Sequence, residues 1–335
     1  MDPLTHGLAS FALKRAFFPK IPRPVLTSMF LAGIAADLDW LSSFIGPAAY
    51  LKWNNGPLHS IVAAVIVGFF ISVVIRAYAK SRGMILNGIV WWFAPICAAL
   101  LHVGMDSLLS SGIQLFWPIS PKHIALDWAP TFDFWVLGLF AAGLLLPELF
   151  RLVTDEIGAK SKKPRGQAGA IVAFTLVAAY AVARGMLHAD AALVIMQRSY
   201  AGESPRRGAA FPDSTSLFTW HAVIETESAL HLVNVPTGPL GSFDPENATH
   251  IHKPDPSPLL ETAQKTEAAR QFLANARFPK ATVQKETEGF SVEIRDLRFD
   301  ATGQNSHVVE AEINLDQNSR VTFAQLNWQN QPRPH

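Results

Sequence analysis

Long stretches without a charged residue constrain this chain more than any other feature. Residues 61–75 read IVAAVIVGFFISVVI, and comparable uncharged stretches occupy 85–101, 134–147 and 168–183. Each approaches the roughly 20 residues that an α-helix needs to cross the hydrocarbon core of a bilayer. Only 16% of the residues are charged and 49% are hydrophobic, whereas about 25% of residues are charged in typical soluble proteins. We therefore expect an integral membrane protein.

The apolar segments predict a mainly α-helical fold, a polytopic membrane bundle of about six helices. We expect these helices at residues 4–18, 25–44, 58–79, 84–106, 133–153 and 167–190. The first is short for a complete span, so it is expected to enter the bilayer only part of the way. Together these helices define an expected membrane-embedded domain of residues 1–195.

The composition changes near residue 199. The segment GESPRRG predicts a linker, and the later runs TWHAVIET, ALHLVNV, FSVEIRDLRF, HVVEAEINL and RVTFAQLNW alternate apolar with polar residues, as half-buried strands do. Between these runs, LLETAQKTEAARQFLANA has helical periodicity. Residues 199–335 are therefore expected to form an extramembrane α+β domain.

Histidines and aspartates lie at the ends of the apolar segments. They are His6, Asp37, Asp39, His59, His102 and Asp106. Ionisable groups at membrane helices are costly to keep and indicate a functional site. His102 and Asp106 stand four residues apart, on one face of a helix, where both can bind one cation. Imidazole and carboxylate ligands suit zinc, manganese or iron. The alternative, that each polar residue merely caps a helix or hydrogen-bonds in a core, fits a lone histidine better than a set of six.

Basic residues predict the orientation of the helices. They gather in three connections, as Lys14, Arg15, Lys20 and Arg23, then Lys80 and Arg82, then Lys160, Lys162, Lys163 and Arg165. The positive-inside rule makes these connections cytoplasmic, which puts both termini and the C-terminal domain outside. All six histidines and aspartates then fall on the outer side, which scattered structural residues would not be expected to do. The start Met-Asp-Pro-Leu-Thr-His lacks the basic region of a removable signal peptide, so His6 is expected in the mature protein.

The segment 107–133 is expected as a loop on the same outer side. Gly112, Pro118, Pro121 and Pro130 interrupt any long helix there, and Trp117, Trp128 and Trp135 suit the headgroup level of a membrane. His123, Asp127 and Asp133 are further polar candidates, although Asp133 is also placed to cap the following helix. The single cysteine, Cys97, cannot form an intramolecular disulfide. A net charge of +1 predicts no nucleic-acid partner.

Several short motifs resemble those of a known family. They are MDPLTHG at 1–7, ADLD at 36–39, GPLHS at 56–60, LHVGMD at 101–106 and FWPIS at 116–120. Residues 1–150 resemble the YdjM-type inner-membrane proteins, a family grouped with metal-dependent hydrolases, and the polar set is similar to the ligand pattern of zinc-dependent phospholipase C. The resemblance implies a multi-pass protein of the bacterial inner membrane. It implies His6, Asp39, His59, His102 and Asp106 as metal ligands, with Asp37 a weaker candidate. Ala36 and Leu58 depart from the usual Pro and Thr of the family.

These observations lead to a functional hypothesis, a membrane-bound metal-dependent hydrolase. Divalent metal, with zinc favoured, would activate water, and Asp37 or Asp127 could accept its proton. The expected partners are the lipid bilayer and a small-molecule or lipid substrate, with a phosphoester favoured and peptide or amide substrates left open. The alternative is a non-catalytic, metal-stabilised scaffold or sensor whose C-terminal domain binds a partner. A structural zinc is closed by four protein ligands, whereas a catalytic zinc keeps a position for water.

Overall fold

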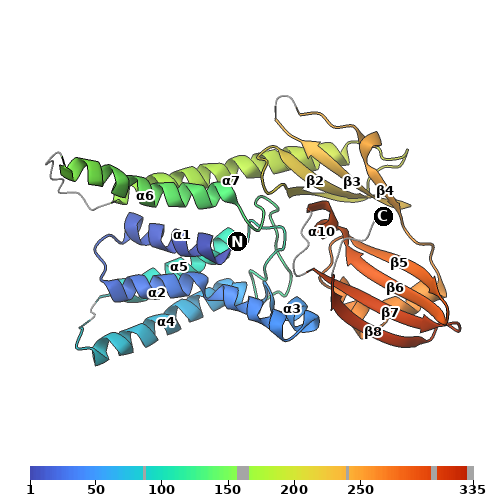
Figure 1. Ribbon diagram of the computed structural model, residues 1–335, viewed down its shortest axis with the longest axis horizontal. Helices are drawn as coiled ribbons and strands as arrows, with labels where there is room; N and C mark the ends of the chain where they lie inside the picture. The colour runs from blue at the N-terminus through green and yellow to red at the C-terminus, as the bar shows by residue number, and fades with distance from the viewer. Residues whose placement is uncertain (86–87, 157–165, 239–240, 303–307, 330–335) are drawn as a thin grey trace. The chain divides into compact units, whose positions relative to one another are not determined.

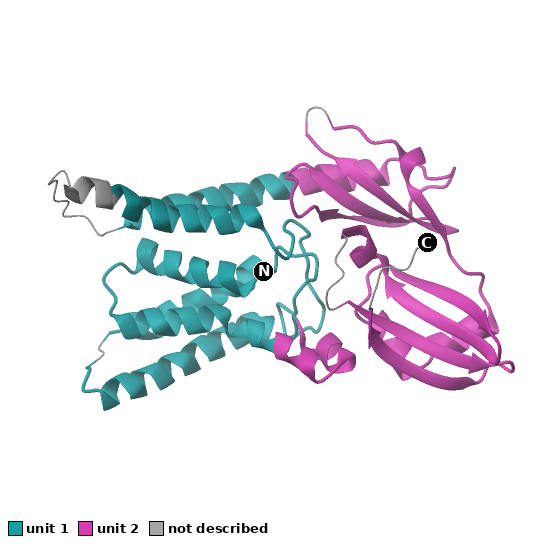
Figure 2. Ribbon diagram, viewed as in Figure 1, with its two compact units in different colours: residues 1–39, 55–186 teal, residues 40–54, 187–335 magenta. Residues whose placement is uncertain are grey.

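The computed structural model describes residues 1–85, 88–156, 166–238, 241–302 and 308–329 (Figure 1). The chain divides into two compact units (Figure 2). Unit 1 comprises Met1–Asp39 and Asn55–Met186, and unit 2 comprises Trp40–Asn54 and Leu187–His335. The basic segment 160–165 and His307 lie outside the described residues.

Unit 1 is helical, and its main elements follow the apolar segments of the sequence. They are α1 (Pro3–Phe17), α2 (Arg23–Ile34), η2 (Pro57–His59), α4 (Ile61–Ser81), α5 (Val90–Asp106), α6 (Phe134–Glu156) and the first part of α7 (Gln167–Met196). The 3₁₀ helix η1 (Ala36–Phe44) follows α2, and α3 (Pro47–Trp53) belongs to unit 2.

The expectation of about six membrane-spanning helices is not confirmed. Among the described residues, α4 and α7 are long and apolar enough to cross a membrane. A third span is possible if α2 and η1 count together, although they are bent by 50° relative to one another. The apolar part of α6 and the whole of α5 are shorter. The helix expected at 84–106 begins later than predicted, and the helix expected at 25–44 is interrupted. Both are therefore shorter than the predicted spans.

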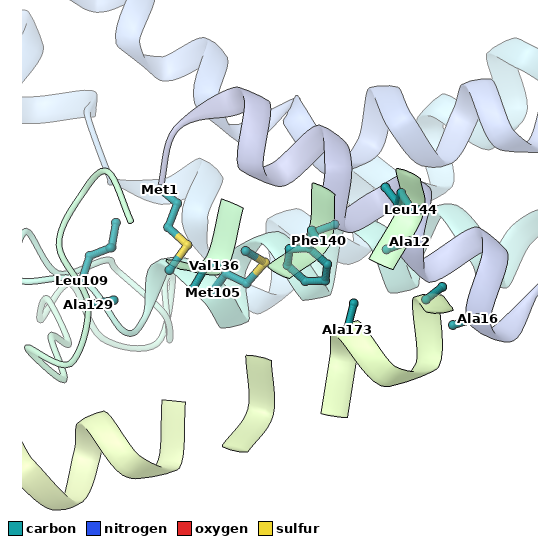
Figure 3. Close-up of a cluster of buried hydrophobic side chains, with 12 residues drawn as sticks. Met1, Ala12, Ala16, Met105, Leu109, Ala129, Val136, Phe140, Leu144 and Ala173 are labelled. Carbon is teal, nitrogen blue, oxygen red and sulfur yellow. The ribbon is translucent and has the colours of Figure 1, made fainter. Parts of the chain in front are cut away.

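Small residues allow the helices of unit 1 to approach closely. A Cβ atom built on Gly68 of α4 would lie 2.7 Å from the Cα atom of Ile96 in α5. A Cβ on Gly143 of α6 would lie 2.5 Å from that of Ala173 in α7. Interfaces of this kind are favoured in membranes because helices there associate through close van der Waals contact. Figure 3 shows one resulting core, where Phe140 lies among small and sulfur-containing side chains.

The predicted helix at 25–44 is interrupted. Its α-helical part ends at Ile34, and Ala36–Phe44 continues as the 3₁₀ helix η1. Within η1 the carboxylate of Asp39 accepts a hydrogen bond from the backbone N–H of Asn55 at 2.8 Å. The break places Asp37 and Asp39, two residues apart, in different surroundings, which matters for the site described below.

Unit 2 contains two four-stranded antiparallel sheets in which the strands follow chain order. The first consists of β1 (Arg207–Pro212), β2 (Thr219–Glu225), β3 (Ala229–Pro236) and β4 (Thr249–His252). The second consists of β5 (Pro279–Glu286), β6 (Gly289–Asp296), β7 (Val309–Asp316) and β8 (Val321–Trp328). The short helices are η3 (Pro245–Asn247), α8 (Pro258–Gln264), α9 (Glu267–Leu273) and α10 (Leu297–Thr302). Phe272 of α9 packs with Val292 and Ile313 in the core beside the second sheet.

The five alternating runs contain β2, β3, β6, β7 and β8, so the α+β character of this region follows the sequence. Two details differ from the prediction. The helical run at 259–276 forms two helices rather than one, since the Thr266 hydroxyl accepts from the N–H of Ala269 and so caps α9. The end of FSVEIRDLRF forms α10 rather than strand.

Candidate metal centre

Side chains from three helical elements meet inside unit 1. His6 comes from α1, Asp37 from η1, and His102 and Asp106 from the end of α5. Each offers one nitrogen or oxygen atom, and these four atoms lie within 4.8 Å of one another. His6, His102 and Asp106 are buried, while Asp37 is half-buried. Of the residues expected as ligands, His6, His102 and Asp106 belong to this compact group, which also includes Asp37.

Asp106 lies at the centre of the group. Its Oδ1 atom is 3.1 Å from Nε2 of His6, and its Oδ2 atom is 3.1 Å from Nε2 of His59 and 3.2 Å from Nε2 of His102. The amino group of Met1 also contacts Oδ1. Three imidazoles therefore direct the same ring nitrogen at one carboxylate.

The carbonyl oxygen of Gly33 sets the orientation of the His102 ring. Nδ1–H of His102 donates to the carbonyl oxygen of Gly33 at 2.8 Å, which leaves the lone pair of Nε2 directed at the cluster. Histidines that bind metal commonly have their second nitrogen held in this way. A Cβ atom at position 33 would overlap Oγ of Ser10 in α1, so the close approach requires glycine. No sequence pattern distinguished Gly33 among the small residues around it.

Asp39 contacts His59 from the side away from Asp106. Oδ2 of Asp39 lies 3.0 Å from Nδ1 of His59. Burial lowers the pKa of His59, but hydrogen bonds to Asp106 and Asp39 outweigh it and raise the pKa to about 9. Asp39 therefore contacts His59 and lies outside the compact group, and the ligand role that the family resemblance implied for it stays a prediction.

Two observations fit this group to a divalent metal ion. First, Nδ1 of His6 and Oδ2 of Asp37 are buried without a hydrogen-bond partner among the described residues. Buried polar atoms are rarely left unsatisfied in a native protein. Second, a donor set of imidazole nitrogens and carboxylate oxygens is the one that zinc and similar transition metals prefer.

The polar residues of the 107–133 loop lie outside the compact group. Asp127 is buried with a positive φ of 59°, and its expected role as a proton acceptor stays a prediction. Asp133 accepts hydrogen bonds from the N–H groups of Trp135 and Val136, at 2.9 and 3.1 Å, so it caps α6. It also accepts from the hydroxyl of Tyr180 at 2.7 Å.

An apolar cavity lies beside the cluster, within unit 1. Its lining includes Met1, which contacts Asp106, and Met105, the residue before Asp106. Two polar side chains of α7 also line it. Arg184 donates from Nε to the carbonyl oxygen of Trp128 at 3.0 Å, and Tyr180 is bonded to Asp133. The sequence did not predict this cavity, because it depends on how α7 packs against the loop.

Comparisons with known proteins agree with this architecture. The YdjM inner membrane protein family matches residues 1–191, and the YfhP C-terminal alpha/beta plait domain matches residues 258–333. The uncharacterized protein YfhP of Bacillus subtilis (strain 168) is 28% identical over 141 residues, a match that spans 40% of this chain and 42% of that relative. No solved structure matches the chain. The chain belongs to the YdjM inner membrane protein family.

Proposed function

We propose that this chain is a membrane-bound metal-dependent hydrolase that cleaves a phosphoester of a lipid or lipid-related molecule. The observation that carries the proposal is the meeting of His6, Asp37, His102 and Asp106 within 4.8 Å. Membership in an inner-membrane family supports a site that works at the bilayer. The proposed location is the bacterial inner membrane, with the site and the C-terminal domain on the outer side.

The roles of the residues follow from their contacts. A divalent metal held here would lower the pKa of a bound water towards about 7 and polarise a phosphoryl oxygen. His6, His102 and Asp106, with His59 beside them, would hold it. Asp37 lies 3.8 Å from His102 and its side chain is 17% exposed, so it can both reach the cluster and exchange a proton with solvent. Asp37 is therefore the favoured proton acceptor and Asp39 a positioning residue.

The surroundings of the cluster support a partly apolar substrate. The cavity beside Asp106 is lined by apolar side chains apart from Tyr180 and Arg184. Binding sites commonly combine an apolar wall with a few oriented polar groups. The cavity is small, with room for only a few methylene groups next to a hydrolysable headgroup.

The compact group also supports the alternative of a non-catalytic scaffold. It has four members, and four protein ligands close a structural zinc site. Under this alternative Asp37 is a ligand, and its removal releases the metal. Under the hydrolase proposal Asp37 acts on water, and its removal leaves the metal in place.

The test is metal content and hydrolysis in detergent-purified protein carrying Asp37→Asn or His102→Ala. The proposal predicts that wild type hydrolyses at least one member of a panel of lipid phosphoesters. Asp37→Asn should keep its metal and lose activity, while His102→Ala should lose both. Metal-loaded wild type that cleaves no phosphoester, together with loss of metal in Asp37→Asn, would leave the scaffold as the better account.

A further inference from the structure

Two histidines of unit 2 face each other across neighbouring strands. His231 of β3 is the direct partner of His250 in β4, so their side chains project from the same face of the sheet. Their Nδ1 atoms are 2.5 Å apart and the rings are nearly perpendicular, at 84°. His231 is 1% exposed, whereas His250 is exposed on the edge strand.

The hydrogen bonds around His231 assign its tautomer. Oγ1 of Thr226 lies 3.0 Å from Nε2 of His231, and its own hydrogen is directed at the carbonyl oxygen of Ala229, 3.2 Å away. A hydroxyl that donates to a carbonyl oxygen in this way accepts from Nε2–H of His231. Nδ1 of His231 is then unprotonated, and its lone pair faces His250. Burial and the neighbouring His250 lower the pKa of His231, which keeps the ring neutral.

A third histidine lies on the same face. His252 is two residues beyond His250 in β4, and successive residues of a strand alternate between faces. Its cross-strand partner is Ala229, and its own side chain is exposed. The carboxylate of Glu203 also acts on His231 and is fixed by the N–H and hydroxyl of Ser228, at 3.1 and 2.7 Å.

We propose that His231 and His250 bind a divalent transition-metal ion through their Nδ1 atoms, with His252 as a third ligand from the same strand face. The hydrogen bond between Nε2–H of His231 and Thr226 is the kind of contact by which proteins orient metal-binding imidazoles. Zinc–nitrogen bonds are about 2.0–2.1 Å long, so the two nitrogens must move apart to about 3.3 Å. His250 and His252 can supply this movement because both are exposed on the short edge strand β4.

This site is independent of the cluster in unit 1. Its residues all belong to unit 2, while His6, Asp37, His102 and Asp106 belong to unit 1. The two sites can therefore be removed separately, and the failure of one proposal does not decide the other.

The test is zinc binding by the full chain in detergent, measured as ions per chain after removal of loosely bound metal. His250→Ala should lose one zinc relative to wild type, and His252→Ala should bind that zinc about tenfold more weakly. Both side chains are exposed, so neither substitution opens a cavity. The matched control is His221→Ala in β2 of the same sheet, where the ring contacts Asp213 and Asn234 instead.

The same measurement in a His102→Ala background isolates the second site. There, zinc should still bind, and adding His250→Ala should abolish it, while adding His221→Ala should not. Equal zinc content in wild type and His250→Ala would overturn the proposal. So would equal losses in the His250 and His221 variants, because a general effect on the sheet would then explain both.

Discussion

The tautomer of His102 depends on a backbone carbonyl that no side-chain pattern reveals. Gly33 accepts the Nδ1 proton of His102, and only the absence of a side chain at position 33 lets α1 pass beside it. A residue with no chemistry of its own thus determines which nitrogen faces Asp106. Positioning of this kind typically changes metal affinity by about 10–100-fold.

Gly33→Ala is expected to weaken metal binding by about tenfold or more. The new methyl group meets Oγ of Ser10, so α1 or the Gly33 carbonyl must shift. Adding Ser10→Ala should recover part of the affinity, because it removes the nearest atom. The control is Gly104→Ala in α5, where a Cβ atom meets nothing within 4 Å. Zinc titration of wild type and the three variants checks this, and equal affinities for Gly33→Ala and Gly104→Ala would contradict it.

His102→Ala is expected to lower bound metal clearly below the wild-type content while the protein still inserts. The substitution removes an imidazole from the compact group, whereas insertion depends on the length of the apolar helices. Metal analysis of membrane-extracted protein measures the first effect and yield in the membrane fraction the second. His188→Ala in α7 serves as the control, since His188 lies against Trp220 rather than in the cluster. Unchanged metal in His102→Ala would exclude His102 as a ligand.

For single residues, the sequence predicts which side chains gather at the candidate metal centre but not the role of each one. Ionisable residues at apolar helices are costly, which is why His6, His59 and His102 could be selected without a structure. The family resemblance favoured Asp39 over Asp37 as a ligand, and the helix was expected to fray at this pair. The break after Ile34 could not be predicted from the sequence, and it directs Asp37 towards His102 and Asp39 towards His59.

At the scale of elements, strands with strong alternation were predictable and weak ones were not. β7 alternates and is largely buried, so its pattern was evident in the sequence. β4 has only four residues, and β5 is mostly polar and half-exposed or exposed. Such strands form because a neighbour offers hydrogen-bonding groups, and that information lies outside their own sequence.

The cavity along α7 gives a prediction that rests on the proposed function. Ala181→Phe should fill the cavity and reduce kcat/KM for a long-chain phosphoester about tenfold, since excluding two methylene groups at about 0.8 kcal/mol each costs about 1.6 kcal/mol. A short, water-soluble phosphoester should be cleaved as before, and metal content should not change. The control is Val182→Phe, because Val182 is 60% exposed on the same helix. Equal losses for both substrates would contradict the assignment of the cavity to the apolar part of the substrate.

The His231 strand pair gives a pH prediction for the metal-free protein. Burial lowers the pKa of His231 below its ordinary value of 6.5, and the charges of His250, His252 and Lys253 lower it further while Glu203 raises it. Below that value the unfolded chain binds more protons than the folded chain, so the free energy of unfolding decreases as the pH falls. The contribution of His231 to the free energy of unfolding is complete above pH 6.5, and it is lost as the pH decreases towards the pKa of His231 in the folded state.

Thermal unfolding between pH 7.5 and 5.5 with a chelator present measures this effect. His231→Gln should show a flatter dependence on pH than wild type, whatever its stability at pH 7.5. A wild-type slope in His231→Gln would assign the pH dependence to other groups.

Across the molecule, different sequence patterns predict the two units: the length of apolar segments for unit 1, and the alternation of apolar and polar residues for unit 2. The helices of unit 1 follow its apolar segments, although two of them begin late or break, and two or three of those described are long enough to span a membrane. Most strands of unit 2 lie where apolar and polar residues alternate in the sequence. The helix α7 contributes residues 167–186 to unit 1 and 187–196 to unit 2.

The last prediction concerns sidedness and rests on charge alone. Lys14 and Arg15 lie in the last turn of α1, and Lys80 lies in the last turn of α4. The basic residues at 160–165 lie outside the described residues, but their charge enters the rule regardless of their structure. We expect these segments to be cytoplasmic and residues 199–335 to be outside. A reporter that works only outside the cytoplasm should therefore be active when fused after His335 and silent when inserted at Gly83. The opposite pattern would place the metal centre towards the cytoplasm, where an outer-leaflet phosphoester could not reach it, and the substrate would have to be sought among cytoplasmic or inner-leaflet molecules.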